Sequence, residues 1–306
     1  MAQAPPTSEI LTLLSSLSNP TNHDLHTKAL QIQAQTLSAS PITYSQTCVQ
    51  FARTLATASP EQIPALEIQK WSEYDLQSVQ SLQSNPIGGW SQMRQMAGLL
   101  LKNALLNPPI DQNTKTRMRL LNDASMEIKQ VLCQGIVDSD IGVRRVSSGL
   151  IARCTVAHVA DGMDALALEE NKWGEFILGP FLINCLESAI SIMEGKTSTE
   201  IESKIQFALF GALQTLANCL EDNPEKFERG IGAAFNKIVP ALLKLLQLCR
   251  DEKVKVNSLK CCVHLVQVMP GSLIAQMHDF LGVLSMLAND ESSEVRKLVC
   301  RSIVSM

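Results

Sequence analysis

Apolar residues recur at three- and four-residue spacing along most of the chain, which is the pattern of amphipathic α-helices. Leu11, Leu14 and Leu17, for example, share one helix face before the Asn-Pro step at residues 19–20. This spacing, interrupted by Pro, Gly and Asn, predicts six helix pairs. In the first pair, one helix ends near residue 18 and the next starts near residue 21. The other five pairs are 42–58 with 92–107, 113–135 with 140–157, 172–193 with 199–220, 228–249 with 252–269, and 272–288 with 291–306.

A short pattern recurs where the second helix of a pair begins. DSDIGVRRVSSGLIA at residues 138–152 and NDESSEVRKLVCRSIV at residues 289–304 are its clearest copies, and weaker ones lie at residues 91–106 and 250–266. Aligning the copies places these basic residues at equivalent positions: Arg94, Arg145, Lys255 and Arg296. The preceding Asp or Ser is a typical helix N-cap. We expect the basic side chains to bind a carboxylate or cap of a neighbouring repeat and to fix the register between repeats.

A recurring unit of roughly 40 to 60 residues matches the period of HEAT repeats. Hydrophobic residues make up 45% of the chain but aromatic residues only 4%, so the apolar content is mainly aliphatic and suits packing between helices. The sequence therefore predicts an all-α fold, a right-handed superhelical α-solenoid of about six HEAT repeats. Such a stack binds partners along a surface and seldom contains a catalytic pocket.

Two insertions interrupt the repeat pattern. Residues 59–89 contain three prolines and a Gly-Gly pair, and we expect a long connection with a short helix around residues 72–82. Trp71 either packs this connection against the array or contacts a partner, and packing is favoured. The second insertion, residues 158–171, is acidic.

The C-terminal helix ends without a polar capping repeat. Val299, Ile303 and Val304 are expected to face solvent or a repeat that is missing. We therefore expect the chain to be the front part of a longer solenoid.

Charge and motifs argue against several functional classes. The formal net charge is −4, and the nearest approach to a basic patch, KTRMR at residues 115–119, is expected to be a solvated helix face, so nucleic-acid binding is not predicted. No phosphate loop, nucleophile elbow or zinc-protease motif occurs, so no catalytic residue and no enzyme activity are predicted. No secretory signal or membrane-spanning segment is expected.

The nine cysteines are odd in number and include no CxxC motif. Most lie in apolar helical segments and are expected to be buried thiols in a reducing compartment. Cys261, Cys262 and His264 are close in sequence, but adjacent cysteines on a helix point about 100° apart. We predict neither a metal site nor a cofactor.

Residues 27–106 resemble the N-terminal domain of the importin-β family of nuclear transport receptors. The resemblance rests on Arg94, Ala97, Gly98 and the run LLLKNAL at residues 99–105. Segments beginning at residues 128, 210, 239 and 280 resemble the third to sixth repeats of the transportin branch of this family. The expected organisation is an importin-β N-terminal-like domain at residues 1–106, with the 59–89 insertion, followed by HEAT repeats 3–6 at residues 107–306.

The resemblance implies a nuclear import receptor that binds the GTP form of Ran through the inner, second helices of its first repeats. It implies Lys102 and Asn103 as contact candidates, with Gln92 and Gln95 as weaker ones. It also implies cargo with nuclear localisation signals, bound largely outside this chain, nucleoporins as further partners, and shuttling between cytoplasm and nucleus. The alternative is a non-transport HEAT scaffold such as a phosphatase scaffold subunit, and LLLKNAL and the uneven repeats favour transport.

Overall fold

The computed structural model describes residues 6–18, 23–74, 80, 86–156, 166–169, 172–195 and 202–306. Within these ranges the secondary structure is helical apart from one isolated β-bridge, between Ile110 and Arg117. The prediction of an all-α, helical-repeat fold is confirmed. The chain divides into two compact units, one formed by Met1–Leu150 with Val159–Leu166 and the other by Ile151–His158 with Ala167–Met306.

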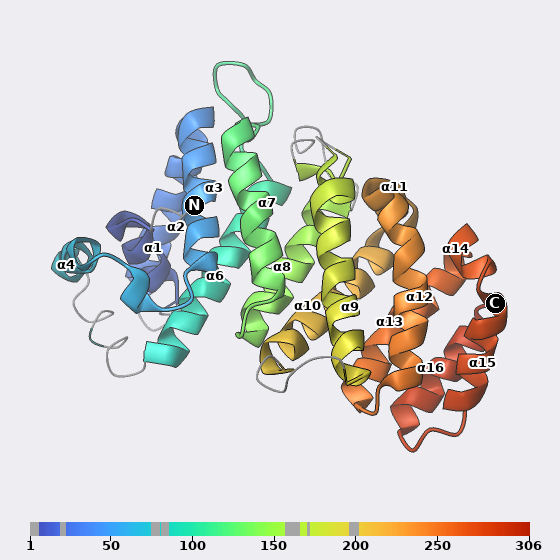
Figure 1. Ribbon diagram of the computed structural model, residues 1–306. Helices are drawn as coiled ribbons and strands as arrows, with labels where there is room; N and C mark the ends of the chain where they lie inside the picture. Colours follow the sequence, from blue (N-terminus) through green and yellow to red (C-terminus); the bar gives the residue numbers. More distant parts are fainter. Residues whose placement is uncertain are drawn as a thin grey trace. The chain divides into compact units, whose positions relative to one another are not determined.

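The first unit is a stack of helices centred on α3 (Figure 1). Its helices are α1 (Ser8–Ser18), α2 (His23–Ala39), α3 (Pro41–Ala56), α4 (Ala65–Tyr74), α6 (Pro86–Leu106), α7 (Asn122–Ile136) and α8 (Ile141–Ile151), the last residue of which belongs to the second unit. α3 packs against α2, α6 and α7, and α1 packs against α2, α4 and α6. Tyr44 of α3 is buried and donates its hydroxyl to the carbonyl of Ala104 on α6 at 3.0 Å. This bond and the surrounding apolar core hold α3 and α6 together as one pair.

The insertion at residues 59–89 contributes to the core of the first unit. It begins with a 3₁₀ turn (Pro60–Gln62) and continues into α4, which packs on α1. Trp71 is fully buried, so the expectation that it packs against the array is confirmed. Glu67 accepts a hydrogen bond from the backbone amide of Ser8 at 2.7 Å, which caps the start of α1. A short helix is expected around residues 72–82; α4 extends into this range as far as Tyr74, and residues 75–79 and 81–85 lie outside the described ranges.

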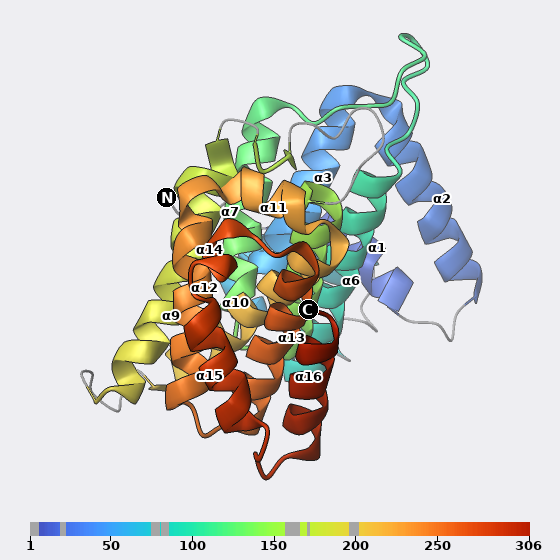
Figure 2. The same ribbon diagram turned by 90° about the vertical axis from the view of Figure 1, so that its right-hand side faces the viewer.

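The second unit contains two layers of helices. It comprises a π-helical turn (Ala152–Val156), a second one (Gly174–Leu178), α9 (Gly179–Met193), α10 (Glu202–Asp222), α11 (Pro224–Ile231), a 3₁₀ turn (Gly232–Ala234), α12 (Phe235–Leu248), α13 (Glu252–Val268), α14 (Gly271–Ile274), α15 (Met277–Leu287) and α16 (Ser293–Val304). α10, α13 and α16 contact one another in sequence, as do α9, α12 and α15, and the pairs α9–α10, α12–α13 and α15–α16 join the layers. Figure 2 looks onto the α15–α16 pair. These contacts are those of successive antiparallel helix pairs, as predicted.

The prediction of one long helix over residues 113–135 is wrong. α7 begins at Asn122, and residues 109–118 form a short hairpin that projects beyond α6 and α7 (Figures 1 and 2). The carboxylate of Asp111 accepts hydrogen bonds from the amide of Asn113 and the hydroxyl of Thr114, at 2.9 and 3.1 Å. Local side-chain bonds of this kind compete with helix formation. KTRMR therefore lies in the hairpin, from its turn at Lys115 into its second strand, and not on a helix face.

Two other predicted helices are divided. Residues 228–249 fall partly in α11 and partly in α12, because Gly232 adopts a left-handed φ of 54° between them. Residues 272–288 are split between α14 and α15. The acidic insertion at residues 158–171 lies outside the described residues except for 166–169.

Two helical stretches of the second unit, Gly174–Met193 and Pro224–Leu248, are long and apolar enough to cross a membrane by length and composition alone. Both pack within the unit: α9 lies against α10 and α12, and α12 lies against α9, α13 and α15. The second stretch is also interrupted at Gly232. About half of each stretch is buried in the helical stack, whereas Phe176, Ile177 and Leu248 are exposed.

The cysteines agree with the prediction of buried thiols at eight of nine positions, and Cys300 is exposed. Burial raises the pKa of Cys185 to about 11 and that of Cys262 to about 12. Cys261 is fully buried and donates its thiol to the carbonyl of Leu213 at 3.6 Å. These thiols belong to the helix interfaces.

The last helix corrects one expectation about the C-terminus. Ile303 and Val304 of α16 are exposed, as predicted, with Val304 86% exposed. Val299, however, is buried. It lies on the face of α16 that includes Val295 and Ser302, both also buried, and α16 packs against α13 and α15.

Candidate partner-binding surface

The four residues implied by the family resemblance lie along one side of α6. Gln92 and Asn103 are exposed, and Gln95 and Lys102 are partly exposed. At 100° per residue they fall within one 100° arc of the helix, together with Leu99, which is 43% exposed. The opposite side of α6 carries Trp90, Arg94, Ala97, Leu101 and Leu105, all buried. We call the exposed set of Gln92, Gln95, Leu99, Lys102 and Asn103 the α6 stripe.

Close approach of α8 fixes α6 on the side next to the stripe. A Cβ added to Gly98 would lie 2.3 Å from Cγ1 of Val146, and one added to Gly142 would lie 2.1 Å from Nε2 of Gln95. Only glycine fits at either position without a shift of the neighbouring side chain. Gln95 also donates a hydrogen bond to the hydroxyl of Ser91 at 3.0 Å. Gln95 is thus held in place, whereas Gln92 and Asn103 extend into solvent.

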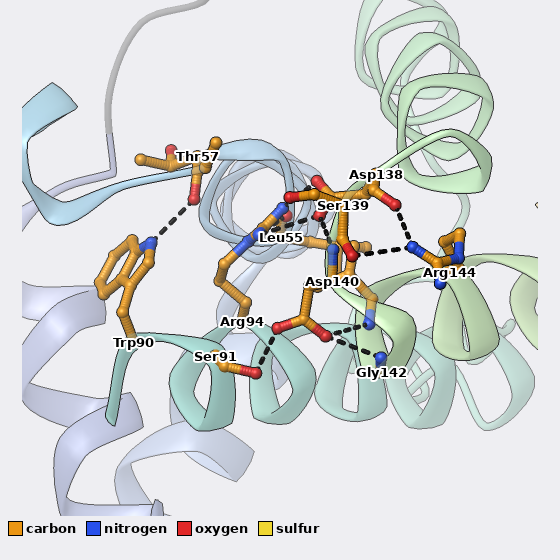
Figure 3. A network of polar contacts seen from close by, with 12 residues as sticks. Leu55, Thr57, Trp90, Ser91, Arg94, Asp138, Ser139, Asp140, Gly142 and Arg144 are labelled. Carbon is orange, nitrogen blue, oxygen red and sulfur yellow. Dashed lines mark hydrogen bonds and ion pairs between the residues drawn. The ribbon is translucent and has the colours of Figure 1, made fainter. Parts of the chain in front are cut away.

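A network of polar contacts anchors the N-terminal half of α6 (Figure 3). Arg94 is 3% exposed and forms a bidentate ion pair with Asp138 in the α7–α8 turn. Its Nε also donates to the carbonyl of Leu55 at 3.0 Å, at the end of α3. One guanidinium therefore joins three helical elements of the first unit, which is the geometry for which Arg is better suited than Lys.

Asp140 is the second acidic group of this network. It accepts hydrogen bonds from the hydroxyl of Ser91 and from the amides of Gly142 and Val143, the latter two at 2.7 and 3.2 Å, and so caps α8. Burial raises the pKa of Asp140, but these bonds and the charge of Arg94 outweigh burial and leave the pKa below its usual 3.8. The carboxylate is therefore charged near neutral pH.

The second unit repeats this arrangement. Lys255 of α13 forms an ion pair with Asp290 in the α15–α16 turn at 2.6 Å, and Glu252 accepts a hydrogen bond from the N-cap Ser292. The bond from Lys255 is the main cause that lowers the pKa of Asp290. The predicted charged pairs between neighbouring repeats are confirmed for Arg94–Asp138 and for Lys255–Asp290. The prediction is wrong for Arg296, which donates to carbonyls in the turn before its own helix.

The alignment of the repeats needs one correction, at Arg145. Arg144 donates to the carbonyls of Asp138 and Ser139 in the turn before its own helix, and Arg296 donates to the carbonyls at the equivalent turn positions 290 and 291. Arg144 follows its N-cap Asp140 by four residues, as Arg296 follows Ser292. The residue equivalent to Arg296 is therefore Arg144, which is buried, whereas Arg145 is exposed.

A cavity of about 470 Å³ lies beside the network in the first unit. It is lined by Ala58, Ser59, Pro60, Glu61, Trp90, Ser91, Arg94, Ser139 and Asp140. The indole of Trp90 is buried and donates to the carbonyl of Thr57 at 2.8 Å, which closes one side. Among the residues that the structure describes, no group of three or more His, Cys, Asp and Glu residues has the arrangement of a metal site.

The network contains residues that the sequence did not identify. Asp138 pairs with Arg94, Asp140 caps α8, and Ser91 donates to Asp140. Asp138 and Asp140 lie in the Asp-Ser-Asp segment before α8, which signals a capping role, whereas no sequence pattern signals the role of Ser91. Together these residues position α6 and α8, and the α6 stripe remains open for a macromolecular partner. The first unit thus offers a rigid helical surface with mixed polar and apolar character.

No protein-family model matches the chain. Over 107 residues, 35% of the chain, it is 28% identical to "Transportin" of Dictyostelium discoideum, a match that spans 11% of that protein. Over 217 residues, 69% of the chain, it is 24% identical to "Importin subunit beta-2" of Schizosaccharomyces pombe, a match that spans 20% of that protein. The chain thus covers at most a fifth of the length of these curated relatives.

Solved structures of helical-repeat type also align with the chain. A crystal structure of an engineered protein has a TM-score of 0.41 and 17% identity, over 97% of this chain and 96% of that one. A crystal structure of computationally designed armadillo repeat proteins has a TM-score of 0.39 and 14% identity, over 97% of this chain and 99% of that one.

Proposed function

We propose that this chain, a relative of the importin-β family, acts as a nuclear import receptor of the transportin type. It binds the GTP form of Ran through the second helices of its N-terminal repeats and carries protein cargo through nuclear pores. Cargo with nuclear localisation signals binds later repeats, largely outside this chain, and nucleoporins are its further partners. The receptor shuttles between cytoplasm and nucleus and acts by binding, not by catalysis.

The α6 stripe is the observation that supports this proposal most directly. It lies on the helix that carries LLLKNAL, the run on which the family resemblance rests, and it combines amide, basic and apolar side chains on one rigid face. Protein interfaces place an apolar anchor at the centre and polar groups around it. Leu99 is such an anchor, and Gln92, Lys102 and Asn103 flank it.

Release of cargo follows from coupling between two binding sites. The GTPase favours one curvature of the helical stack and the cargo favours another, so that binding of one weakens binding of the other. Stacked repeats suit this mechanism because a small change at each repeat interface adds along the array. The paired contacts Arg94–Asp138 and Lys255–Asp290 lie at such interfaces.

Substitution of the stripe tests the proposal. Leu99→Asp places a charge at the centre of the stripe and is expected to weaken binding to Ran loaded with a GTP analogue by roughly tenfold or more, since a hot-spot change costs above about 1.4 kcal/mol. Lys102→Glu is expected to weaken binding less and in a salt-dependent manner. Calorimetry or interferometry with the purified chain measures both.

Matched control variants distinguish a loss of binding at the α6 stripe from a general effect of added negative charge. Leu281 on α15 is 48% exposed, close to the exposure of Leu99, and Lys237 on α12 is an exposed lysine. Leu281→Asp and Lys237→Glu are expected to leave binding unchanged. Equal losses from Leu99→Asp and Leu281→Asp, in folded samples, would contradict the assignment of the α6 stripe.

A further inference from the structure

The hairpin between α6 and α7 is ordered by its own bonds. The amide of Asp111 donates to the carbonyl of Thr116, and the amide of Met118 donates to the carbonyl of Pro109, both at 2.8 Å. Between these bonds lies the bridge from Ile110 to Arg117. Lys115 closes the turn with a φ of 59°, and its amide donates to the carbonyl of Asp111 at 2.8 Å. The segment is therefore preformed before any partner binds.

The second strand of the hairpin has two different faces. Met118 and Leu120 are buried against the first unit, whereas Arg117 and Arg119 are exposed. This alternation follows from the period of two in extended chain. Ile110, opposite Arg117 in the bridge, is 54% exposed. The outward face thus carries two guanidinium groups and one apolar side chain, with Lys115 at the adjacent turn.

The outer edge of this strand is open. Since the amide of Met118 and the carbonyl of Thr116 point to the first strand, the amides and carbonyls of Arg117 and Arg119 point the other way. In the described part of the chain neither of these residues has a backbone hydrogen-bond partner. An unpaired strand edge is a template for a further strand.

We propose that this edge binds an extended acidic segment of another protein as an added strand. Carboxylates at alternate positions of that segment lie on one face, about 6.6 Å apart, and meet Arg117 and Arg119, which have the same spacing. The partner's backbone pairs with the free amides and carbonyls of the edge.

The chemistry favours a peptide over a nucleic acid. Only three exposed basic side chains lie here, whereas nucleic-acid affinity comes mainly from many phosphate contacts. An open strand edge, in contrast, offers alternating donors and acceptors that only another extended polypeptide matches. The proposal goes beyond transport of cargo and does not depend on binding of the GTPase.

Peptide binding to the full chain tests this proposal. The probe is a fluorescent ten-residue peptide with Glu at alternate positions among Thr and Val, measured by anisotropy. Arg117→Glu together with Arg119→Glu is expected to weaken binding at least tenfold, because two charge-assisted contacts are lost. A double control, Lys237→Glu with Lys260→Glu, makes the same charge change at exposed helical positions and is expected to change binding less than twofold.

Backbone pairing is tested separately with N-methylated peptides. Methyl groups on one alternate set of peptide nitrogens are expected to abolish binding, and methyl groups on the other set to preserve it, because only one set faces the strand edge. Absence of binding by the folded wild-type chain, equal losses in the control pair, or equal effects of both methyl sets would overturn the proposal. So would tighter binding of single-stranded DNA of equal charge through the same arginines.

Discussion

Replacement of Arg94 by Ala is expected to loosen the N-terminal half of α6. The guanidinium is 3% exposed and makes two contacts to Asp138 and one to the carbonyl of Leu55. Removal leaves Asp138, whose side chain is 13% exposed, with a hydrogen bond from the amide of Asp140 at 2.8 Å but without its cationic partner on α6. It also removes the hydrogen bond that Arg94 donates to the carbonyl of Leu55 at the end of α3.

The size of the effect follows from burial. Loss of one partner from a buried ion pair costs about 3 to 5 kcal/mol, and the partial exposure of Asp138 places the expected loss at about 3 kcal/mol. Lys255→Ala breaks the equivalent pair in the second unit. There the lysine and Asp290 side chains are 17% and 11% exposed and share a single contact, so the expected loss is smaller, about 1 to 2 kcal/mol.

Hydrogen exchange measured by mass spectrometry is the suitable assay, because a stacked array does not unfold as one two-state unit. A loss of about 3 kcal/mol corresponds to exchange roughly 100-fold faster in amides of α6 and the α7–α8 turn that exchange by local opening. The second unit serves as the internal reference. Less than threefold acceleration in α6, or equal acceleration in α10 and α13, would refute the reasoning.

Three further predictions concern packing, thiols and pH. Gly98→Ala is expected to destabilise α6 by about 1 to 3 kcal/mol, measured by hydrogen exchange, because its Cβ would meet Val146 at 2.3 Å. Gly282→Ala, with open space around it, is expected to stabilise α15 by up to about 1 kcal/mol in the same measurement. A neutral Gly98→Ala would contradict the packing. One thiol, Cys300, is expected to react rapidly with Ellman's reagent at pH 8, and Cys300→Ser to abolish that phase; several fast thiols in the folded chain would argue against the burial. The pKa of Asp140 is lowered by folding, so the stabilising effect of this carboxylate is present above pH 3.8 and is lost as the pH falls through the lower folded value. Asp140→Asn is therefore expected to reduce the urea midpoint at pH 7, and the difference from wild type is expected to shrink towards pH 3. A pH-independent difference would contradict the assignment.

The repeat architecture and the interface ladder were predictable because they depend on local patterns. An N-cap Asp or Ser followed four residues later by a basic side chain defines the start of α8, α13 and α16. The partners Asp138 and Asp290 lie in the turns that precede two of these helices. The single shift in register arose at Val-Arg-Arg, where two adjacent arginines fit the pattern and only burial distinguishes Arg144 from Arg145.

The hairpin and the role of α4 were not predictable from helical periodicity. Met118 and Leu120 are two residues apart, which is the period of an extended strand and places them about 200° apart on a helix. The bonds of the Asp111 side chain also oppose a helix here. Trp71 is buried by a long-range contact of α4 with α1, which local sequence does not specify. The four candidate contact residues came from the family resemblance, and the structure adds that they share one side of α6 with Leu99.

The central claim is that this chain binds a GTPase according to its nucleotide state. The most direct measurement compares binding of the purified chain to Ran loaded with a GTP analogue and to Ran loaded with GDP, in the same buffer and at the same salt concentration. Tight binding to the GTP form and at least 100-fold weaker binding to the GDP form, a difference of about 2.7 kcal/mol or more, is the predicted result. Equal affinity for both forms, or no binding to either by a folded sample, would contradict the account.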